Sequence, residues 1–287
     1  LQTLWREVMS ACRAMEEPVK VAYLGPAGTY TEQAMFKQFG HAIVGVDCVS
    51  IDDIFHAVAA GGATFGVVPI ENSIEGAINR TMDLLLNSPL RVCAEVSLAI
   101  QHSLLHRTGN MDGVTTIVAH PQALAQCYAW LKQHYPHVTQ KPVSSNAQGA
   151  KMAVDDPAVA CIAGDSAAMM YELQKVAVGI QDDANNRTRF VVLGKQVCSP
   201  SPADKTSLIL AAPNKAGSVF ALIEPLARHG VSMVRFESRP AKQKGWEYYC
   251  YIDFIGHVDE PNVAAALKEI EAQAAFYKCL GSYPVTE

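Results

Sequence analysis

The chain has 287 residues, of which 49% are apolar and 18% are charged, and its formal net charge is −5. This length suggests about two globular domains with enough apolar material for large cores. The negative balance gives no indication of nucleic acid or an anionic membrane surface as a partner. No apolar run approaches the ~20 residues of a membrane span, and the sequence shows no signal peptide, so we expect a cytoplasmic protein.

The eight cysteines are scattered without a C-x-x-C pair, and the nine histidines include no H-E-x-x-H spacing. Scattered cysteines in apolar contexts favour reduced thiols over a disulfide framework or a zinc site. We therefore expect neither a metal nor any other cofactor.

Apolar residues recur at helical spacing at the start of the chain and predict an amphipathic helix over residues 1–16, which Pro18 ends. No segment before it in this sequence offers a partner for its apolar face. We therefore expect residues 1–17 to be the end of a separate domain.

Strand-like and helical segments then alternate from Val19 to Val192. This order is typical of a doubly wound α/β fold, and the length suits two small lobes with a cleft between them, over residues 18–197. The predicted strands are 19–24, 43–49, 65–70, 92–100, 115–119, 159–163, 176–180 and 189–193.

The last of these strands has an unusual start. Val191 to Leu193 form a continuous apolar run, which predicts a strand buried on both faces of a parallel sheet. Turn-forming Asn185 and Asn186 precede it, and Thr188 and Arg189 stand at its entrance. These two side chains are either a solvated strand entrance or functional groups at the edge of a core.

Residues 198–205 have the composition of a linker, and the order of elements changes after them. Strands at 206–212, 231–238, 247–255 and 276–281 and helices at 218–229 and 261–275 give a βαββαβ order. That order predicts a ferredoxin-like module over residues 206–287. Its exposed edge strand favours pairing with a second copy.

Several loops of the α/β part carry helix-start signals just after a predicted strand. Three pairs have capping-box spacing, and one proline suits a first helical position: Thr29 with Glu32, Asn72 with Glu75, Ser145 with Gln148, and Pro121 after His120. Helix N-termini attract carboxylate or phosphate, and ligands of doubly wound folds lie beyond the carboxyl ends of the strands. The sequence therefore predicts a cleft for a small anion, built from backbone donors and neutral side chains. The loop 25–28 is neither a P-loop nor G-x-G-x-x-G, so a nucleotide is not indicated.

These segments, taken together and in this order, resemble prephenate dehydratase with a C-terminal ACT domain. The resemblance runs from Val19 to Pro284, and Thr188-Arg189-Phe190 is similar to the family's Thr-Arg-Phe signature. The other matching segments are 21–26 with 28–30, Pro69-Ile70-Glu71-Asn72-Ser73, His120-Pro121-Gln122, the loop 214–219, and Glu237-Ser238-Arg239-Pro240.

The resemblance implies a reaction in L-phenylalanine biosynthesis, in which prephenate loses carbon dioxide and a ring hydroxyl to give phenylpyruvate. We expect Thr188 to donate a hydrogen bond, or to relay a proton, to that hydroxyl. Glu71 is the candidate for a stronger acid behind it if burial raises its pKa, and Asn72 and Gln126 complete the expected catalytic set.

The expected substrate-binding residues are Gly28, Thr29, Ser73, Ser145, Arg189 and Phe190. Two interpretations of Arg189 stay open: it pairs with a substrate carboxylate, or it forms a structural ion pair on the face opposite Thr188. Ala119 stands where the family commonly has serine, so a substrate contact and some affinity would be lost if that hydroxyl touches substrate. We expect His120 to cap a helix and not to act as a base.

The ACT module implies L-phenylalanine as an inhibitor bound at a dimer interface, in a homodimer or tetramer. Its expected residues are Asn214, Ala216, Gly217, Ser218, Val219, Glu237, Ser238, Arg239 and Pro240. Ser218 and Val219 depart from the usual alanine and leucine, which would alter affinity by ~1–3 kcal/mol. Alternatively, Glu237 and Arg239 form a plain ion pair at a strand end.

Residues 4–16 resemble the end of the chorismate mutase domain that precedes this enzyme in bifunctional relatives, and we expect no mutase activity from one such helix. Two other functions stay open at this stage. Arogenate dehydratase differs in a substrate that carries an ammonium group. A solute-binding protein shares the two-lobed architecture without catalysis.

Overall fold

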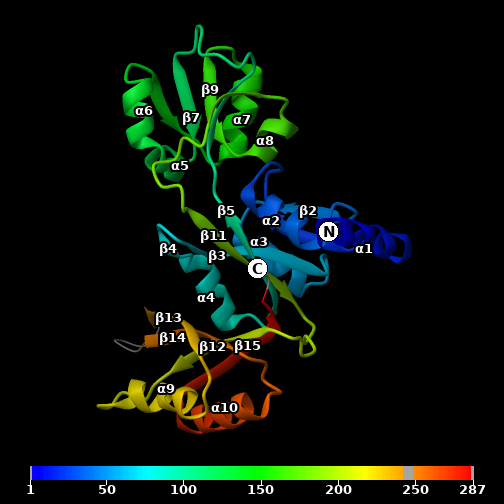
Figure 1. Cartoon of the computed structure of the whole chain (residues 1–287), viewed down its shortest axis with the longest axis vertical. Coiled ribbons are helices and arrows are strands. Elements are labelled where there is room, and N and C mark those ends of the chain that lie inside the picture. Colours follow the sequence, from blue (N-terminus) through cyan, green and yellow to red (C-terminus); the bar gives the residue numbers. More distant parts are fainter. Residues whose placement is uncertain (1, 242–247, 286–287) are drawn as a thin grey trace.

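The computed structural model describes residues 2–241 and 248–285, and it places three β-sheets one above another along the longest axis of the molecule (Figure 1). The first lies in a central lobe, the second in an upper lobe, and the third at the C-terminal end of the chain. The α/β class and the ferredoxin-like end of the chain agree with the predicted fold class.

The central lobe is built on a mixed sheet with the order β2-β1-β3-β11-β5, and β4 pairs with the outer part of β3. Its strands are β1 (Lys20–Leu24), β2 (Val44–Cys48), β3 (Phe65–Asn72), β4 (Gly76–Ala77), β5 (Arg91–Ala99) and β11 (Arg187–Gly194). Its helices are α2 (Tyr30–Phe39), α3 (Ile51–Ala59) and α4 (Asn79–Asn87).

The direction of β11 differs from the prediction, because this strand runs antiparallel to both β3 and β5. Its apolar run comes from burial on two faces: Val191 and Leu193 pack in the cluster of α3, and Phe190 and Val192 pack in the cluster of α2. A strand covered on both faces needs apolar residues at every position, whatever its direction relative to its neighbours. The apolar pattern therefore predicted the burial of β11 correctly and its direction relative to β3 and β5 wrongly.

The upper lobe has a five-stranded sheet with the order β10-β6-β9-β7-β8. Its strands are β6 (Ser103–His106), β7 (Thr116–Ala119), β8 (Thr139–Pro142), β9 (Val159–Ala163) and β10 (Gln174–Val178). Its helices are α5 (Pro121–Gln126), α6 (Tyr128–His134), α7 (Asn146–Asp155) and α8 (Asp165–Met170). The chain enters this lobe after β5 and returns to the central lobe between β10 and β11, so two crossings join the lobes (Figure 1).

Strands β4, β6 and β8 were not predicted from the sequence, for reasons that differ between them. The pair Gly76–Ala77 is too short to show alternation. All four residues of β8 are exposed, so the strand has no apolar face to identify it. The four residues of β6 are all buried and follow closely on β5, from which the pattern does not separate them.

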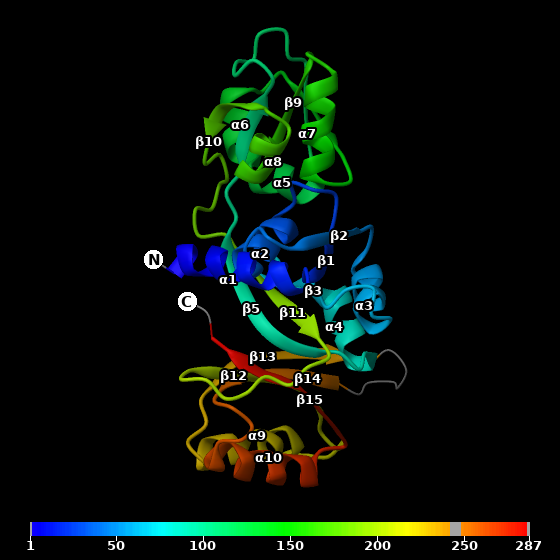
Figure 2. The same cartoon turned by 90° about the vertical axis from the view of Figure 1, so that its right-hand side faces the viewer.

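The third sheet has the order β13-β14-β12-β15, and its paired strands are all antiparallel. Its elements are β12 (Asp204–Ala211), α9 (Ser218–Arg228), β13 (Met233–Pro240), β14 (Tyr248–Ile255), α10 (Pro261–Gln273) and β15 (Phe276–Pro284). The βαββαβ order is the predicted one, although Glu247 of the third predicted strand lies outside the described residues. Figure 2 shows both helices on one face of this sheet and the central lobe against the other.

The third sheet and the central lobe share one hydrophobic core. Tyr251, Leu280 and Tyr283 of the third sheet pack in the same cluster as Val92 and Leu193 of the central lobe. Gly281 has a φ of +135°, and a Cβ there would lie 2.6 Å from the carbonyl oxygen of Val92. Glycine therefore lets β15 approach β5 closely, and the two parts are packed together like a single core.

Polar contacts fasten the same junction to α4. The Nζ of Lys278 donates to three carbonyl oxygens at the C-terminal end of α4, those of Leu85, Leu86 and Ser88. The hydroxyl of Tyr251 donates to the carbonyl of Met82 at 2.9 Å. A cation at a helix C-terminus stabilises its unpaired carbonyl groups.

Helix α1 (Gln2–Glu16) lies beside the C-terminal end of α2 and the loop that follows it. Glu7 bonds both the backbone and the ring of His41, and Ser10 accepts a hydrogen bond from the backbone of Ala42. Trp5 and Met15 remain largely exposed. Across residues 2–241 and 248–285, no helix has both the length and the apolar character needed to cross a membrane.

Candidate active site

A pocket of about 340 Å³ lies between the two α/β lobes. The first turns of α2, α5 and α7 face it, and Asn72, Thr188 and Phe190 reach it from β3 and β11. Its volume is in the range of small-molecule sites, ~300–1,000 Å³. Among the described residues that line it, none is Asp, Glu, Lys or Arg. The pocket is therefore formally neutral.

The helix starts at the pocket are capped by neutral side chains. Thr29 Oγ1 accepts from the backbone N–H of Glu32 at 3.3 Å, and Ser145 Oγ accepts from that of Gln148 at 3.0 Å. His120 Nδ1 accepts from the N–H of Gln122, which confirms the predicted capping role of this histidine. Three helix N-termini around one neutral cavity favour an anionic ligand.

The fourth predicted helix start is a different structure. Asn72 Oδ1 accepts from the backbone N–H groups of Ile74 and Glu75, but the chain then forms β4 and not a helix. An asparagine can stabilise a tight turn in this way as readily as it caps a helix. The spacing alone does not distinguish the two structures.

Asn72 and Thr188 form the centre of the pocket wall. The two residues are paired across β3 and β11, and Asn72 Nδ2 donates to Thr188 Oγ1 at 2.9 Å. The same amide donates to Asn186 Oδ1 at 2.9 Å. Because the Thr188 oxygen accepts from Asn72, its O–H is left to donate, and no protein acceptor for it occurs in the described part of the chain.

Gln126 joins the upper lobe to this pair. Its Oε1 accepts from Asn186 Nδ2 at 3.0 Å and lies 3.0 Å from His102 Nε2. His102 Nδ1 in turn lies 3.3 Å from the hydroxyl of Tyr30. A hydrogen-bonded chain thus runs from Tyr30 through His102, Gln126 and Asn186 to Asn72, and it spans both lobes.

Sequence reasoning missed His102, and it classified Asn186 only as a turn former. The one signal for His102 was its position just after a strand predicted to end at residue 100. Asn186 precedes Thr188 by two residues and is buried, with 1% of its surface exposed. Neither His102 nor Asn186 belongs to a motif whose spacing predicts a functional site.

Glu71 and Arg189 are on the wrong side of the sheet for the catalytic and substrate roles predicted for them. Side chains alternate along a strand, so the neighbours of Asn72 and Thr188 point to the opposite face. There Arg189 Nη2 lies 2.9 Å from Glu71 Oε2, and neither residue lines the pocket. Of the two open interpretations of Arg189, the structure supports the ion pair, and Glu71 is not placed to protonate a ligand.

The remaining predicted residues divide in the same way. Gly28, Thr29, Ser145 and Phe190 line the pocket. Ser73 does not: its Oγ accepts from the backbone N–H of Arg187 at 2.9 Å, which fixes the start of β11.

Ala119 does not line the pocket either, since it is fully buried in the core of the upper lobe. The expected loss of a substrate contact at this position is therefore not supported.

Five of the nine residues predicted for the effector line two different cavities of one chain. Asn214, Ser218 and Val219 line a cavity of about 160 Å³ at the start of α9, where Gly217 has a φ of +80° and Ala216 completes the loop. The Ser218 hydroxyl donates to the carbonyl of Lys215 in its own loop.

The second effector motif forms the last four residues of β13, from Glu237 through Ser238 to Pro240. Arg239 pairs with Asp83 of α4 at 2.9 Å, so the alternative ion pair with Glu237 is not what the structure shows. Arg239 and Pro240 line a cavity of about 370 Å³ against α4.

Two titratable groups of the pocket have a shifted pKa: burial raises the pKa of Tyr30, and His102 shifts in the opposite direction. Burial lowers the pKa of its imidazole, and the hydrogen bond with Gln126 opposes this shift only in part. The ring is therefore neutral near pH 7. A neutral ring can donate from Nε2 to Gln126, while the Tyr30 hydroxyl that lies 3.3 Å from Nδ1 donates to the carbonyl of Gln101.

The sequence profile of prephenate dehydratase matches residues 21–197, and that of the ACT domain matches residues 206–272. A bifunctional chorismate mutase/prephenate dehydratase of Pseudomonas aeruginosa is 46% identical, over 98% of this chain and 77% of that protein.

Two further relatives cover nearly all of the same region. A prephenate dehydratase of a Mycobacterium species (strain JLS) is 36% identical, over 92% of this chain and 89% of that protein. The structure of prephenate dehydratase from Arthrobacter aurescens in complex with L-phenylalanine superposes with a TM-score of 0.84 at 32% identity, covering 93% of this chain and 90% of that one.

We predict that His102 makes folding stability fall as pH falls below about 6.5, the ordinary pKa of histidine. The unfolded chain takes up a proton there that the folded chain does not, so acid favours unfolding by up to ~1.4 kcal/mol per pH unit. Urea unfolding at pH 7.5 and 5.5 should show this slope in the wild type and a shallower one in His102→Gln. His137→Gln is the control, because that side chain is exposed. Equal slopes for all three proteins would contradict the prediction.

Proposed function

This chain belongs to the prephenate dehydratase family and converts prephenate into phenylpyruvate, carbon dioxide and water, and we propose that Thr188 is the donor to the departing hydroxyl. The observation that carries the proposal is the hydrogen bond from Asn72 Nδ2 to Thr188 Oγ1 in the pocket wall. The Thr188 oxygen accepts from Asn72 within a pocket that three helix N-termini surround, which leaves its proton free to donate to a ligand there.

The chemistry of the substrate explains why a neutral donor suffices. The bond from the ring to its carboxylate breaks, its electron pair forms a ring double bond, and the ring C–O bond breaks with the electron pair on oxygen. The ring becomes aromatic, so the barrier lies mainly in the departure of hydroxide, a poor leaving group. A donor held at that oxygen stabilises the charge that develops there, and water supplies the net proton.

Asn72 and Gln126 are positioning residues in this proposal. Asn72 fixes the Thr188 oxygen, and Gln126 ties Asn186 and His102 to the same network. Gly28, Thr29 and Ser145 stand at helix starts that suit the two substrate carboxylates, and Phe190, which lines the same pocket, is the proposed contact for the ring.

The neutral lining supports prephenate over arogenate as the substrate. Arogenate carries an ammonium group, and a buried ammonium calls for an acidic partner. The described residues of the pocket lining include no carboxylate. Glu75 lies just outside, with Oε1 3.4 Å from Gln126 Nε2.

We predict at least ~100-fold higher kcat/KM for prephenate than for arogenate, which corresponds to ~2.7 kcal/mol of unpaired charge. Parallel assays of the purified chain, following phenylpyruvate and phenylalanine as products, measure this ratio. A larger kcat/KM for arogenate would reverse the assignment. Turnover of neither substrate would favour a binding protein.

We predict that Thr188→Ala lowers kcat by ~10²–10⁴ and changes KM little, because the lost donor acts on the leaving hydroxyl. Thr188→Ser keeps the hydroxyl and should retain more activity. Steady-state kinetics with prephenate compare the two variants. A Thr188→Ala enzyme with near-normal kcat would rule out the role of Thr188.

We also propose the division of the chain into residues 1–17, 18–197, 198–205 and 206–287. The first part is the end of a chorismate mutase domain, which fits the bifunctional relatives of Pseudomonas aeruginosa and Neisseria gonorrhoeae. A cytoplasmic location stays a prediction.

The ACT module is the proposed receptor for L-phenylalanine, in a homodimer or tetramer. The relative from Arthrobacter aurescens was solved with this ligand. Strand β13 is the edge of the third sheet, and Val219, Phe220, Val234 and Phe236 near it are exposed apolar side chains. Pairing of this face between two copies would cover them and enclose the loop 214–219.

We predict that L-phenylalanine binds and inhibits the enzyme, and that Phe220→Asp weakens both the dimer and the inhibition. A carboxylate placed in an apolar interface opposes association. Titration calorimetry measures binding, and sedimentation measures the oligomer. Val178→Asp, a like change at an exposed valine of the upper lobe, should leave both unchanged. Absence of L-phenylalanine binding by the wild type would remove the regulatory proposal.

A further inference from the structure

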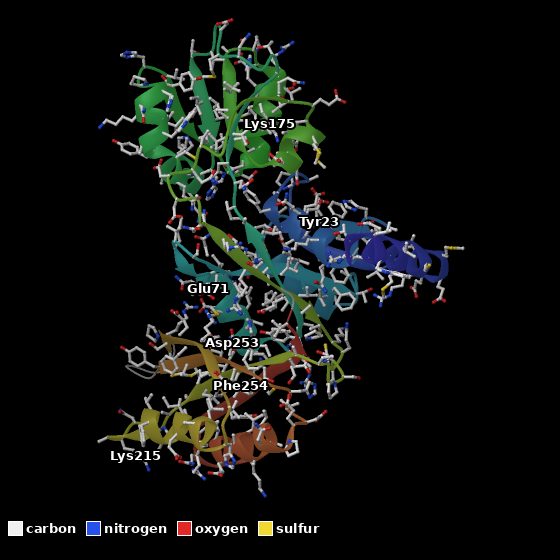
Figure 3. All side chains as sticks on the ribbon, viewed as in Figure 1. Tyr23, Glu71, Lys175, Lys215, Asp253 and Phe254 are labelled. Carbon is white, nitrogen blue, oxygen red and sulfur yellow. The ribbon has the colours of Figure 1, made fainter. Side chains whose placement is uncertain are left out.

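A cluster of six charged side chains lies where the third sheet packs against β3, β5 and β11. We call it the junction cluster, and its members are Arg189, Glu71 and Glu95 of the central lobe and Lys205, Arg235 and Asp253 of the third sheet. Three positive and three negative groups balance in charge. Figure 3 labels Glu71 and Asp253 near this junction.

Arg189 is the centre of the junction cluster. Its Nη1 lies 2.9 Å from Asp253 Oδ2 and 3.2 Å from Glu95 Oε2, and its Nη2 lies 2.9 Å from Glu71 Oε2. The planar guanidinium thus donates to three carboxylates, one of which belongs to the ACT module. Burial lowers the pKa of Arg189, but Asp253, Tyr283 and Glu95 raise it by more, so the group stays charged.

The partner from the ACT module is itself held firmly. Asp253 is 4% exposed, and its Oδ1 accepts from the hydroxyl of Ser207 at 2.6 Å. The same serine oxygen lies 2.8 Å from the hydroxyl of Tyr283. Arg235 Nε lies 3.0 Å from Glu71 Oε2, but the geometry does not make a hydrogen bond. Within the junction cluster, the hydrogen bond to Glu71 therefore comes from Arg189.

The position of Arg189 in β11 connects this link to catalysis. Arg189 pairs with Glu71 across the strands, and the adjacent rung is Thr188 with Asn72. The ladder between β11 and β3 shifts by one residue directly after Arg189, a β-bulge that leaves Ile70 without an opposite residue. A bulge disrupts the ladder locally, so side-chain contacts beside it help to hold the register.

We propose that Arg189 is a positioning residue that acts through Thr188: its ion pairs to Glu71, Glu95 and the ACT residue Asp253 hold the Thr188–Asn72 rung in place beside the bulge. This inference rests on the role proposed above for Thr188. It makes the sheet of the regulatory module part of the support of the catalytic hydroxyl.

Asp253→Asn tests the proposal, because it keeps the shape of the side chain and removes the charge that the ACT module supplies. Small displacements of a catalytic donor are costly in rate. We expect kcat to fall by ~10-fold with prephenate while KM changes by less than ~2-fold. Ser207→Ala, which only loosens Asp253, is the milder second variant and should lower kcat in the same direction by less.

The matched control is Tyr251→Phe. It removes another hydrogen bond across the same junction, the one from Tyr251 to the carbonyl of Met82, without touching β11. We expect its kcat to stay within ~2-fold of the wild type. If the kcat of the Asp253→Asn enzyme equals that of the Tyr251→Phe enzyme, the proposal is overturned.

A double-mutant cycle separates positioning from general stability. If Asp253 acts through the Thr188 hydroxyl, Asp253→Asn should change kcat by less than ~2-fold in a Thr188→Ala background. An equal loss in both backgrounds would show a structural role only and would overturn the link. A Thr188→Ala enzyme with normal kcat is a separate result, since it would refute the role of Thr188 itself.

Discussion

The rest of this molecule depends on the two faces of strand β11. Thr188 points from one face into the pocket between the lobes, and Arg189 points from the other into the junction with the third sheet. The strand lies inside its sheet and is paired on both sides, with β3 and with β5, so the backbone of both residues is held by two neighbours. The proposed catalytic hydroxyl and an ion pair to the third sheet are therefore carried by adjacent residues.

The proposed substrate of this pocket is an anion, yet no described residue of its lining is Asp, Glu, Lys or Arg. Helix N-termini supply oriented N–H groups that need no counter-charge when the ligand is absent. An arginine in the pocket would bind a substrate carboxylate more strongly. It would also stabilise the substrate before reaction, and one of the two substrate carboxylates must leave as carbon dioxide. The Thr188 oxygen is instead hydrogen-bonded to Asn72, and Asn186, Gln126 and His102 continue that network.

The junction with the third sheet differs from a flexible tether. A shared apolar core, a glycine that lets two strands approach, and Lys278 at the end of α4 fasten it at several points. Effectors shift an equilibrium only through contacts that differ between states. A regulatory module this closely joined to β3, β5 and β11 has a short physical route to the pocket.

The sequence by itself determined the class of fold, the βαββαβ order, the burial of β11 and the helix starts that form the pocket. These follow from local periodicity and capping, which need only neighbouring residues. Motif resemblance then identified the family and placed Thr188 in the site.

Glu71 and Arg189 were wrongly predicted to face the cleft. Alternation along a β-strand shows that adjacent side chains point to opposite faces of the sheet, but it does not show which face lines the cleft. The direction of β11, the pairing of Thr188 with Asn72, and the arrival of His102 and Asn186 depend on strands far apart in the sequence. Only the tertiary structure decided them, because contacts between distant segments leave no period in the chain.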